Sequence, residues 1–322
     1  MSQKFHRRRF GFLALAVVAL CSWSGLIWFT RPHEQLWRRP IGEDVVQPLT
    51  FTASAPSHTP PPIVKETEIA EDGTLLVRVP AGEFMMGSDD SLDKQPIHKV
   101  RLGSFWISQT EVTNNSFASF VADTGYQTDA EKAGWSHVWD GMNWIPADGA
   151  SWLHPDGAES DILGMEKHPV VQVSWNDANS YCKWAGMRLP TEAEWEKAAR
   201  GTDGRIYPWG NDPPSKQLLN AQNPTTGTTE VSSYPEGASP YGAYDMSGNV
   251  WEWVNDWYRY DYYGSLGDDA FDPPGPAFGN GRVLRGGAWL NYYDVVRAAD
   301  RSHSNPLFSF RSYGFRCARS SE

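Results

Sequence analysis

Basic residues and regularly spaced histidines are scarce in this 322-residue chain, and each scarcity excludes a class of function. Lysine and arginine together number 28, against 39 aspartates and glutamates, which gives a net charge of −11. Because nucleic-acid binding requires a basic face for the phosphates, we expect no nucleic-acid partner. The eight histidines show neither HxH nor HxxxH spacing. A site in which paired histidines bind iron is therefore not expected.

Cysteine is limited to Cys21, Cys182 and Cys317. Cys21 falls in an apolar N-terminal segment, so two cysteines remain for the folded region. In an oxidising compartment such a pair predicts one disulfide. For so long a loop the chain-entropy model gives a stabilisation of about 4–5 kcal/mol. Two unrelated buried thiols are the other interpretation.

Regular periodicity is also scarce, although the composition is globular, with 40% hydrophobic and 21% charged residues. Strand-like runs occur near Leu75 and Trp106, and almost nothing is periodic after Gly201. Three helices are predicted from their start and stop signals. They are one between a Thr113 cap and Gly125, one that begins after Ser174, and one between the Thr191–Glu194 capping box and Gly201. These features predict one α+β domain with little regular secondary structure.

The N-terminus is predicted to direct export. Lys4 and the triplet Arg7-Arg8-Arg9 precede an apolar run from Phe10 to about Phe29, the order found in a signal peptide or an N-terminal membrane anchor. The run is long enough to span a bilayer, and the arginines with the following residues resemble a twin-arginine signal. We expect the protein in the periplasm or on the extracytoplasmic face of the inner membrane, with its export by the twin-arginine route left open.

Three regions follow from these patterns. Residues 1–30 are the predicted signal peptide or membrane anchor, and residues 31–72 are a linker that is rich in proline around Ala55–Ile63. Residues 73–322 form the predicted domain.

A stretch rich in glycine and tryptophan, Asp245–Trp253, is followed by Arg285–Trp289 and Tyr313–Cys317. Its glycines permit tight turns and close backbone approach. The carboxylates of Asp245 and Glu252 lie among aromatic residues, where burial requires a cation, an arginine or several backbone N–H groups. The stretch is too irregular for a plain strand, and we interpret it as a structural knot that has room for a Ca²⁺ ion.

These motifs resemble the formylglycine-generating enzyme family, also called the sulfatase-modifying-factor domain. The resemblance covers about residues 75–319 and rests on the segments Gly125–Lys132, Trp152–Gly157, His168–Ala178, Met187–Glu196, Gly248–Trp253, Leu284–Trp289 and Gly314–Cys317. It implies a single domain related to the C-type lectin fold. It also matches Cys182 and Cys317 to a disulfide of the family. We expect a monomer.

The resemblance also implies two structural calcium sites. One would use the side chains of Asp245 and Glu252 and the backbone carbonyls of Gly248 and Val250. The other would fall at Asn220 and Ala221, with Asn223 and Thr225 less securely placed because the loop is shorter. Oxygen-only ligands of this kind suit Ca²⁺.

The sequence departs from the family at the catalytic site. Formylglycine-generating enzymes use two cysteines that bind Cu(I), a metal that prefers soft thiolates. Here the first position is Asn291, and the following segment, Tyr292–Arg297, contains no cysteine. Copper is therefore not expected, and the catalytic residues are left unassigned. The candidate groove residues are Trp251, Asn291, Tyr292, Asp294, Arg301, His303 and Tyr313.

Three functions compete for this altered site. The first is an exported oxidoreductase-like tailoring enzyme that acts on a peptide or siderophore-type substrate, similar to the periplasmic enzymes that oxidise the pyoverdine chromophore; we favour it slightly. The second is a non-catalytic module that binds a peptide or small molecule, because residues 291–313 have a paratope-like composition and resemble the variable region of retroelement-diversified proteins. The third is an inactive partner in sulfatase maturation.

Overall fold

The computed structural model describes residues 65–267 and 270–321. The predicted export segment and most of the predicted linker lie outside the described residues. Among the described residues, no helix is both long enough and apolar enough to cross a membrane. Strand β1 (Thr67–Ile69) pairs antiparallel with β2 (Leu75–Val79). Because of this pairing, the ordered domain begins before the expected boundary at residue 73.

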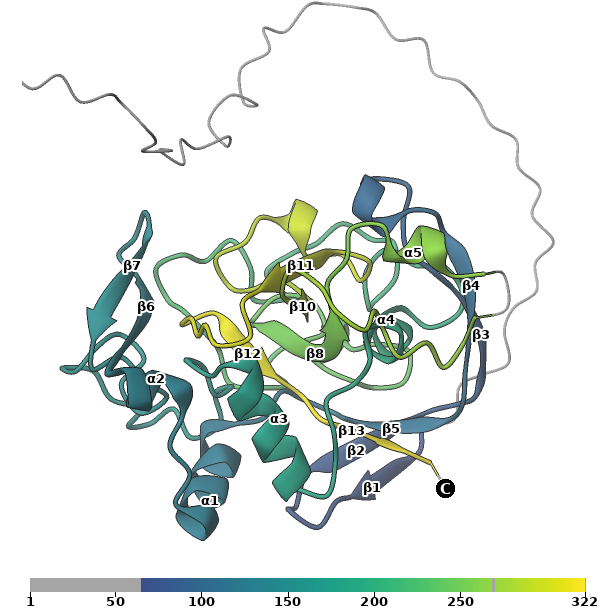
Figure 1. The fold of residues 1–322 in the computed structure, drawn as a ribbon. Coiled ribbons are helices and arrows are strands. Elements are labelled where there is room, and N and C mark those ends of the chain that lie inside the picture. The colour runs from purple at the N-terminus through teal and green to yellow at the C-terminus, as the bar shows by residue number, and fades with distance from the viewer. Residues whose placement is uncertain (1–64, 268–269, 322) are drawn as a thin grey trace, which may run out of the picture. The chain divides into compact units, whose positions relative to one another are not determined.

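Four small sheets make up the β structure of the described residues (Figure 1). Two are four-stranded, with the orders β1-β2-β5-β13 and β11-β10-β8-β12; the others have the orders β3-β4-β9 and β6-β7. The remaining strands are β3 (Gly82–Met86), β4 (His98–Leu102), β5 (Phe105–Ser108), β6 (Trp135–Trp139), β7 (Trp144–Asp148), β8 (Trp251–Trp257), β9 (Ala270–Phe271), β10 (Arg282–Arg285), β11 (Arg301–Ser304), β12 (Tyr313–Phe315) and β13 (Ala318–Ser320).

The three predicted helices are confirmed as α1 (Asn114–Thr124), α3 (Trp175–Trp184) and α4 (Glu192–Arg200). Their N-caps are the predicted Thr113, Ser174 and Thr191, and the last two form complete capping boxes. The structure adds two short helices, α2 (Asp129–Ala133) and α5 (Tyr262–Ser265), and single 3₁₀ turns at Leu92–Lys94, Pro235–Gly237 and Tyr293–Val295. With few helices and short strands, the predicted α+β class is confirmed.

The glycine- and tryptophan-rich stretch contains a central strand, which corrects the expectation that it is too irregular for one. Strand β8 pairs antiparallel with β10 and parallel with β12. Because most of its residues are buried, β8 lacks the alternation of a half-exposed strand. Just before it, Gly248 has φ +83°, and a Cβ there would lie 2.4 Å from the carbonyl oxygen of Asn220. The predicted close backbone approach is therefore present.

Aromatic side chains fill the core. Trp195, Trp253 and Trp289 are the largest fully buried side chains. The predicted disulfide joins Cys182 on α3 to Cys317, with the two Cα atoms 5.6 Å apart. Since Cys317 lies between β12 and β13, this bond attaches the end of the domain to its helical side.

Candidate functional site

A cavity of about 500 Å³ lies where three parts of the chain meet. It is lined by Trp251 and by residues from segments 90–94 and 291–302; we call it the polar groove. Of the predicted groove residues, Trp251, Asn291, Asp294 and Arg301 line this cavity. Segment 90–94, which comes from the loop between β3 and β4, also lines the cavity and was not among the predicted residues.

Asn291, at the position where the resemblance would put a copper ligand, is part of a backbone turn. Its side-chain Oδ1 accepts a hydrogen bond from the backbone N–H of Ala288 at 2.8 Å, and its own N–H donates to the Ala288 carbonyl at 2.9 Å. The Asn291 carbonyl in turn accepts from Gln222 N–H at 2.9 Å. This residue therefore fixes the shape of the groove wall, and its amide is neither a nucleophile nor a redox group.

Ion pairs connect the two walls of the polar groove. Lys94 Nζ lies 2.5 Å from Asp300 Oδ1 and 2.8 Å from Asp90 Oδ1, while Arg297 also pairs with Asp90. Asp300 Oδ2 accepts a hydrogen bond from the backbone N–H of Arg297 at 2.8 Å. Among the described residues, no ion pair involves Asp294, which is exposed. Asp93 also makes no ion pair in the described part of the chain, but its carboxylate accepts hydrogen bonds from Ser91 and Tyr258. Asp294 is therefore an exposed groove carboxylate that can meet a ligand.

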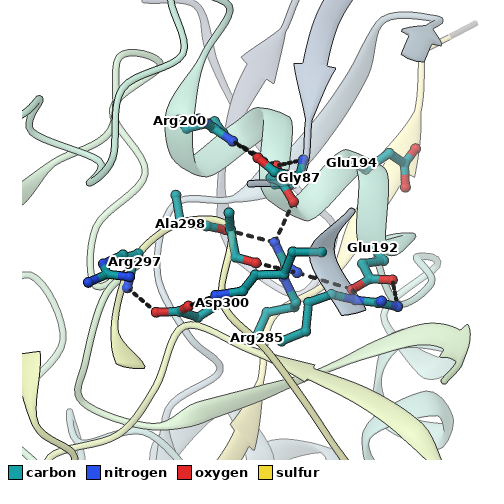
Figure 2. Close-up of polar contacts among 12 residues, drawn as sticks. Gly87, Glu192, Glu194, Arg200, Arg285, Arg297, Ala298 and Asp300 are labelled. Atoms are coloured by element: carbon teal, nitrogen blue, oxygen red, sulfur yellow. Dashed lines mark hydrogen bonds and ion pairs between the residues drawn. The ribbon is translucent and has the colours of Figure 1, made fainter. Parts of the chain in front are cut away.

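Arg301 lines the groove, but its charge belongs to a buried network beneath it (Figure 2). Its guanidinium makes a two-point pair with Glu192, at 2.6 and 2.9 Å, and donates to the Asp93 carbonyl. Glu192 also lies 3.1 Å from Arg285, which pairs with Glu196 at 2.7 Å. Because breaking a buried pair leaves an uncompensated charge, we assign Arg301 to holding the groove floor.

The other predicted groove residues lie outside the cavity lining. The His303 ring stacks on Tyr258, with ring centroids 4.0 Å apart. Burial and the nearby Arg301 charge lower the pKa of His303, so it is neutral at neutral pH. Tyr313 packs against Trp253 and Phe310, and Tyr292 is exposed. His303 and Tyr313 are therefore packing residues here.

A second cavity, of about 390 Å³, was not predicted. We call it the apolar pocket: its lining comes from α2 and from the segments Trp135–His137 and Leu307–Ser309. Trp135, Leu307 and Phe308 remain 40%, 60% and 44% exposed. The only sequence signal was tryptophan and leucine in segments that are far apart along the chain.

An aromatic row of three rings leads from β12 to the apolar pocket. The Tyr313 ring lies 4.6 Å from that of Phe310, and Phe310 stacks on His137 of the apolar pocket at 4.2 Å. The backbone of Tyr313 pairs in register with Trp251, which lines the polar groove. The row therefore begins on the strand next to Trp251 and ends at the apolar pocket.

The residues of the first implied calcium site gather in a buried cluster with a third carboxylate, Glu111. Glu252 is neutralised by Arg316 at 2.6 Å, whereas Asp245 accepts one hydrogen bond from Ser232 N–H at 2.7 Å. Glu111 Oε2 is buried without a hydrogen-bond partner. Burial, with the Asp245 and Glu252 charges, raises the pKa of Glu111 well above its usual range, and burial raises the pKa of Asp245 to about 6. The raised pKa favours the neutral form of Glu111, so the charge of the cluster rests on Asp245 and on the Glu252–Arg316 pair. Within the part of the chain that the structure describes, these carboxylates are not arranged as a group of three that could hold a metal ion, and calcium here stays a prediction.

The second implied calcium set offers neutral oxygens only. The Asn220 side chain donates to the Gly227 carbonyl at 3.0 Å and to Asn249 Oδ1 at 3.2 Å, and Thr225 is exposed. Among the described residues, no group of three or more His, Cys, Asp or Glu side chains is arranged to hold a metal. Because calcium affinity depends on ligand charge, this loop is a poorer match than the Asp245 cluster.

Comparison with known proteins gives a consistent result. Residues 63–321 match the Sulfatase-modifying factor enzyme 1-like domain. The formylglycine-generating enzyme of Mus musculus is 40% identical over 283 residues, covering 76% of this chain and 75% of that enzyme. The enzyme of Streptomyces coelicolor is 42% identical over 285 residues, covering 76% and 89%. Inactive C-alpha-formylglycine-generating enzyme 2 of Bos taurus is 36% identical over 279 residues, covering 76% and 87%.

Two solved structures resemble the domain over their whole length. PvdO from Pseudomonas aeruginosa has a TM-score of 0.64 at 25% identity, covering 82% of this chain and 100% of that chain. Treponema denticola variable protein 1 has a TM-score of 0.58 at 25% identity, covering 80% and 100%. The fold predicted from the motifs is confirmed by these matches.

Proposed function

Because the chain belongs to the Sulfatase-modifying factor enzyme 1-like family yet has no cysteine in its polar groove, we propose that it binds an extended peptide without copper–thiolate chemistry. Formylglycine is a modified amino acid, so relatives named for generating it act on polypeptides. We propose that this chain also binds a peptide, but without the thiol chemistry. We place this function outside the cytoplasm, which the disulfide and the N-terminal export pattern support.

One observation carries the proposal: the position of the missing thiol is occupied by a side chain that hydrogen-bonds its own turn. Asn291 is satisfied by Ala288 N–H, and the groove's lysine and arginines all have carboxylate partners. The turn at Asn291 is therefore held in one shape, and each cationic side chain of the groove is held by a carboxylate. A site of that kind recognises a ligand, because binding requires complementarity and preorganised polar groups rather than a nucleophile.

The two cavities indicate what the ligand offers. Asp294 favours a cationic or hydrogen-bond-donating group in the polar groove. The exposed faces of Trp135, Leu307 and Phe308 around the apolar pocket favour a large apolar side chain, since covering them removes apolar surface from water. An extended peptide that carries one group of each kind meets both requirements along the aromatic row.

The second candidate is the exported oxidoreductase-like tailoring enzyme acting on a peptide or siderophore-type substrate. The full-length likeness to PvdO, with a TM-score of 0.64, favours it. An inactive partner in sulfatase maturation is a special case of the binding proposal, favoured by the 36% identity to an inactive relative.

Selection from a random displayed peptide library with the full-length protein tests the proposal. We expect enriched peptides that share a basic and an apolar position. Asp294→Asn should weaken their binding about tenfold, the loss of one charge-assisted contact. Trp135→Ala should weaken it by a similar factor through the pocket, and Asp261→Asn, on an exposed pair with Arg259, is the matched control.

Three outcomes distinguish the candidates. Enrichment that Asp294→Asn and Trp135→Ala both weaken, and that the control leaves unchanged, supports peptide binding. If no peptide is enriched, or if neither variant weakens binding of the enriched peptides, the peptide-binding proposal is overturned. A mass change in the enriched peptide that requires the protein, together with stoichiometric copper or iron in the purified protein, would favour the oxidoreductase.

A further inference from the structure

The loop between β3 and β4 forms one wall of the polar groove, and both of its ends are firmly held. The N–H of Gly87 donates to Glu196 Oε1 at 2.8 Å, and its carbonyl accepts from Arg200 at 2.9 Å. Met86 pairs with His98 across the ladder. Gly87 has φ +97°, and a Cβ there would lie 2.4 Å from the Lys94 carbonyl oxygen. The loop thus leaves its two strands at a point that only glycine can occupy without strain.

The loop closes on itself between these ends. Ser88 N–H donates to the Lys94 carbonyl at 3.1 Å, and Lys94 N–H donates to Ser91 at 3.1 Å. Gln95 Nε2 donates to the Asp89 carbonyl at 2.9 Å. Residues 88–95 therefore form a compact unit with its own hydrogen bonds, able to move without unfolding internally.

Apolar packing does not hold this unit against the rest of the domain. Leu92, its one large apolar side chain, is 67% exposed, and Lys94 is its one buried residue. The contacts to the opposite wall are polar: Lys94 with Asp300, Asp90 with Arg297, and the Asp93 carbonyl with Arg301. Tyr258 also donates to Asp93 Oδ2 at 3.1 Å. Segments with few buried apolar contacts open at low free-energy cost.

The ion pairs between the unit and the opposite wall differ in solvent exposure, and therefore in strength. Asp90 and Arg297 keep about a third of their side chains exposed, 30% and 34%, so water and salt weaken their attraction. Lys94 and Asp300 are only 9% and 8% exposed. Opening the unit would leave the buried Asp300 carboxylate without its ion-pair partner, whereas Lys94 would keep Asp90, which lies in the same segment. The Lys94–Asp300 pair is therefore the latch.

From this arrangement we propose that residues 88–95 are an electrostatic strap, which closes the polar groove through the Lys94–Asp300 latch and detaches as one unit to admit the ligand. The inference rests on the proposed function, because it concerns access to the same groove. Asp90, Asp93 and Lys94 line the cavity from the strap side, so detachment removes one wall and widens the approach of a long ligand to Trp251 and to the already exposed Asp294.

Hydrogen exchange of the full-length protein, followed by mass spectrometry, tests the strap without any ligand. Lys94→Met should accelerate exchange of the amides in 88–95 by at least about tenfold, while strand β8 keeps its protection. Asp90→Asn removes the two half-exposed contacts and should accelerate exchange of this segment only about two- to threefold. Asp261→Asn, on a surface pair elsewhere, is the matched control and should change nothing in 88–95.

Salt provides a second measurement, should Lys94→Met fail to fold. Raising sodium chloride from about 0.05 M to about 1 M should accelerate exchange of 88–95 in the unaltered protein and leave β8 unchanged. The strap is overturned if Lys94→Met leaves exchange in 88–95 unchanged, or if β8 loses protection in parallel with 88–95. Should Lys94→Met not fold, exchange in 88–95 that responds to neither salt nor Asp90→Asn overturns it. Because this readout needs no peptide, failure of the strap and failure of the peptide-binding proposal are separate results.

Discussion

The guanidinium of Arg316 forms a two-point ion pair with the carboxylate of Glu252, at 2.6 and 2.7 Å, and both side chains are fully buried. Trp195 Nε1 donates to the same carboxylate at 2.8 Å. The remaining arginine donors reach the backbone carbonyls of Ser108, Gln109 and Tyr244. From the sequence, a buried Glu252 carboxylate requires a cation, an arginine or several backbone N–H groups. In the structure Arg316 is its ion-pair partner.

Glu252→Gln should destabilise the protein by about 3–5 kcal/mol, because it leaves the buried Arg316 without a countercharge. Urea unfolding followed by tryptophan fluorescence measures the loss. Asp261→Asn is the control, and it should leave the unfolding midpoint unchanged because its pair with Arg259 is exposed to solvent. Equal unfolding midpoints for Glu252→Gln and the unaltered protein would show that the Arg316–Glu252 pair does not stabilise the fold.

Removing the Cys182–Cys317 bond should lower the free energy of unfolding by about 4–5 kcal/mol in the chain-entropy model, since its ends are 135 residues apart. The double variant Cys182→Ser, Cys317→Ser and the unaltered protein in reductant should show the same loss in chemical unfolding. Cys21→Ser should show none. A reductant that leaves the unaltered protein unchanged would mean that the bond is absent in solution.

Stability should fall as pH rises through the range set by Asp256. Burial and the neighbouring Glu192 charge raise the pKa of Asp256 from 3.8 to about 8. Between these pH values the folded protein holds a proton that the unfolded chain releases. The free energy of unfolding therefore falls as pH rises from about 4 to about 8. Asp256→Asn mimics the neutral carboxyl and can still accept from Glu192 N–H, a bond of 2.8 Å here.

Asp256→Asn should therefore have the same melting temperature as the unaltered protein near pH 4 and a higher one near pH 8. Between these values its melting temperature should depend less steeply on pH. Thermal melts across that range give the comparison. A variant that is less stable than the unaltered protein at pH 8 would show that Asp256 is held ionised.

Calcium removal should lower the melting temperature if the Asp245 cluster holds the ion. We expect calcium in the purified protein and a lower melting temperature after treatment with EDTA, because a ligand that binds only the folded state stabilises it. Asp245→Asn should remove about one equivalent of calcium, measured by elemental mass spectrometry, whereas Asp261→Asn should remove none. Protein that contains no calcium and melts identically in EDTA would remove both implied sites.

Local signals predicted the local parts of this fold. Thr113, Ser174 and Thr191 each cap the helix expected of them, because a cap involves residues only three apart. Strand β8 was missed because its place in the sheet depends on pairing with β10 and β12, which lie far away in sequence, and because α3 and α4 also pack against it.

In the candidate site too, residues within local motifs could be named from the sequence, whereas contacts between distant segments could not. Trp251, Asn291 and Asp294 were located through their motif neighbours, but nothing local shows that the β3–β4 loop forms the facing wall. His303 was expected in the groove, but its ring stacks on Tyr258 and the residue does not line the cavity. The apolar pocket needs Trp135 and Phe308 together, a contact made only once the chain has folded.

Strands β12 and β13 are separated by two residues, yet they complete two different sheets (Figure 1). Strand β12 pairs with β8, and β13 with β5, and Arg316 and Cys317 lie between them. Each sheet therefore needs this short segment to pair with strands that lie far earlier in the chain. The folding rate should be limited by pairing between these distant segments, and a chain cut before Tyr313 should be a target for proteases rather than a smaller working domain.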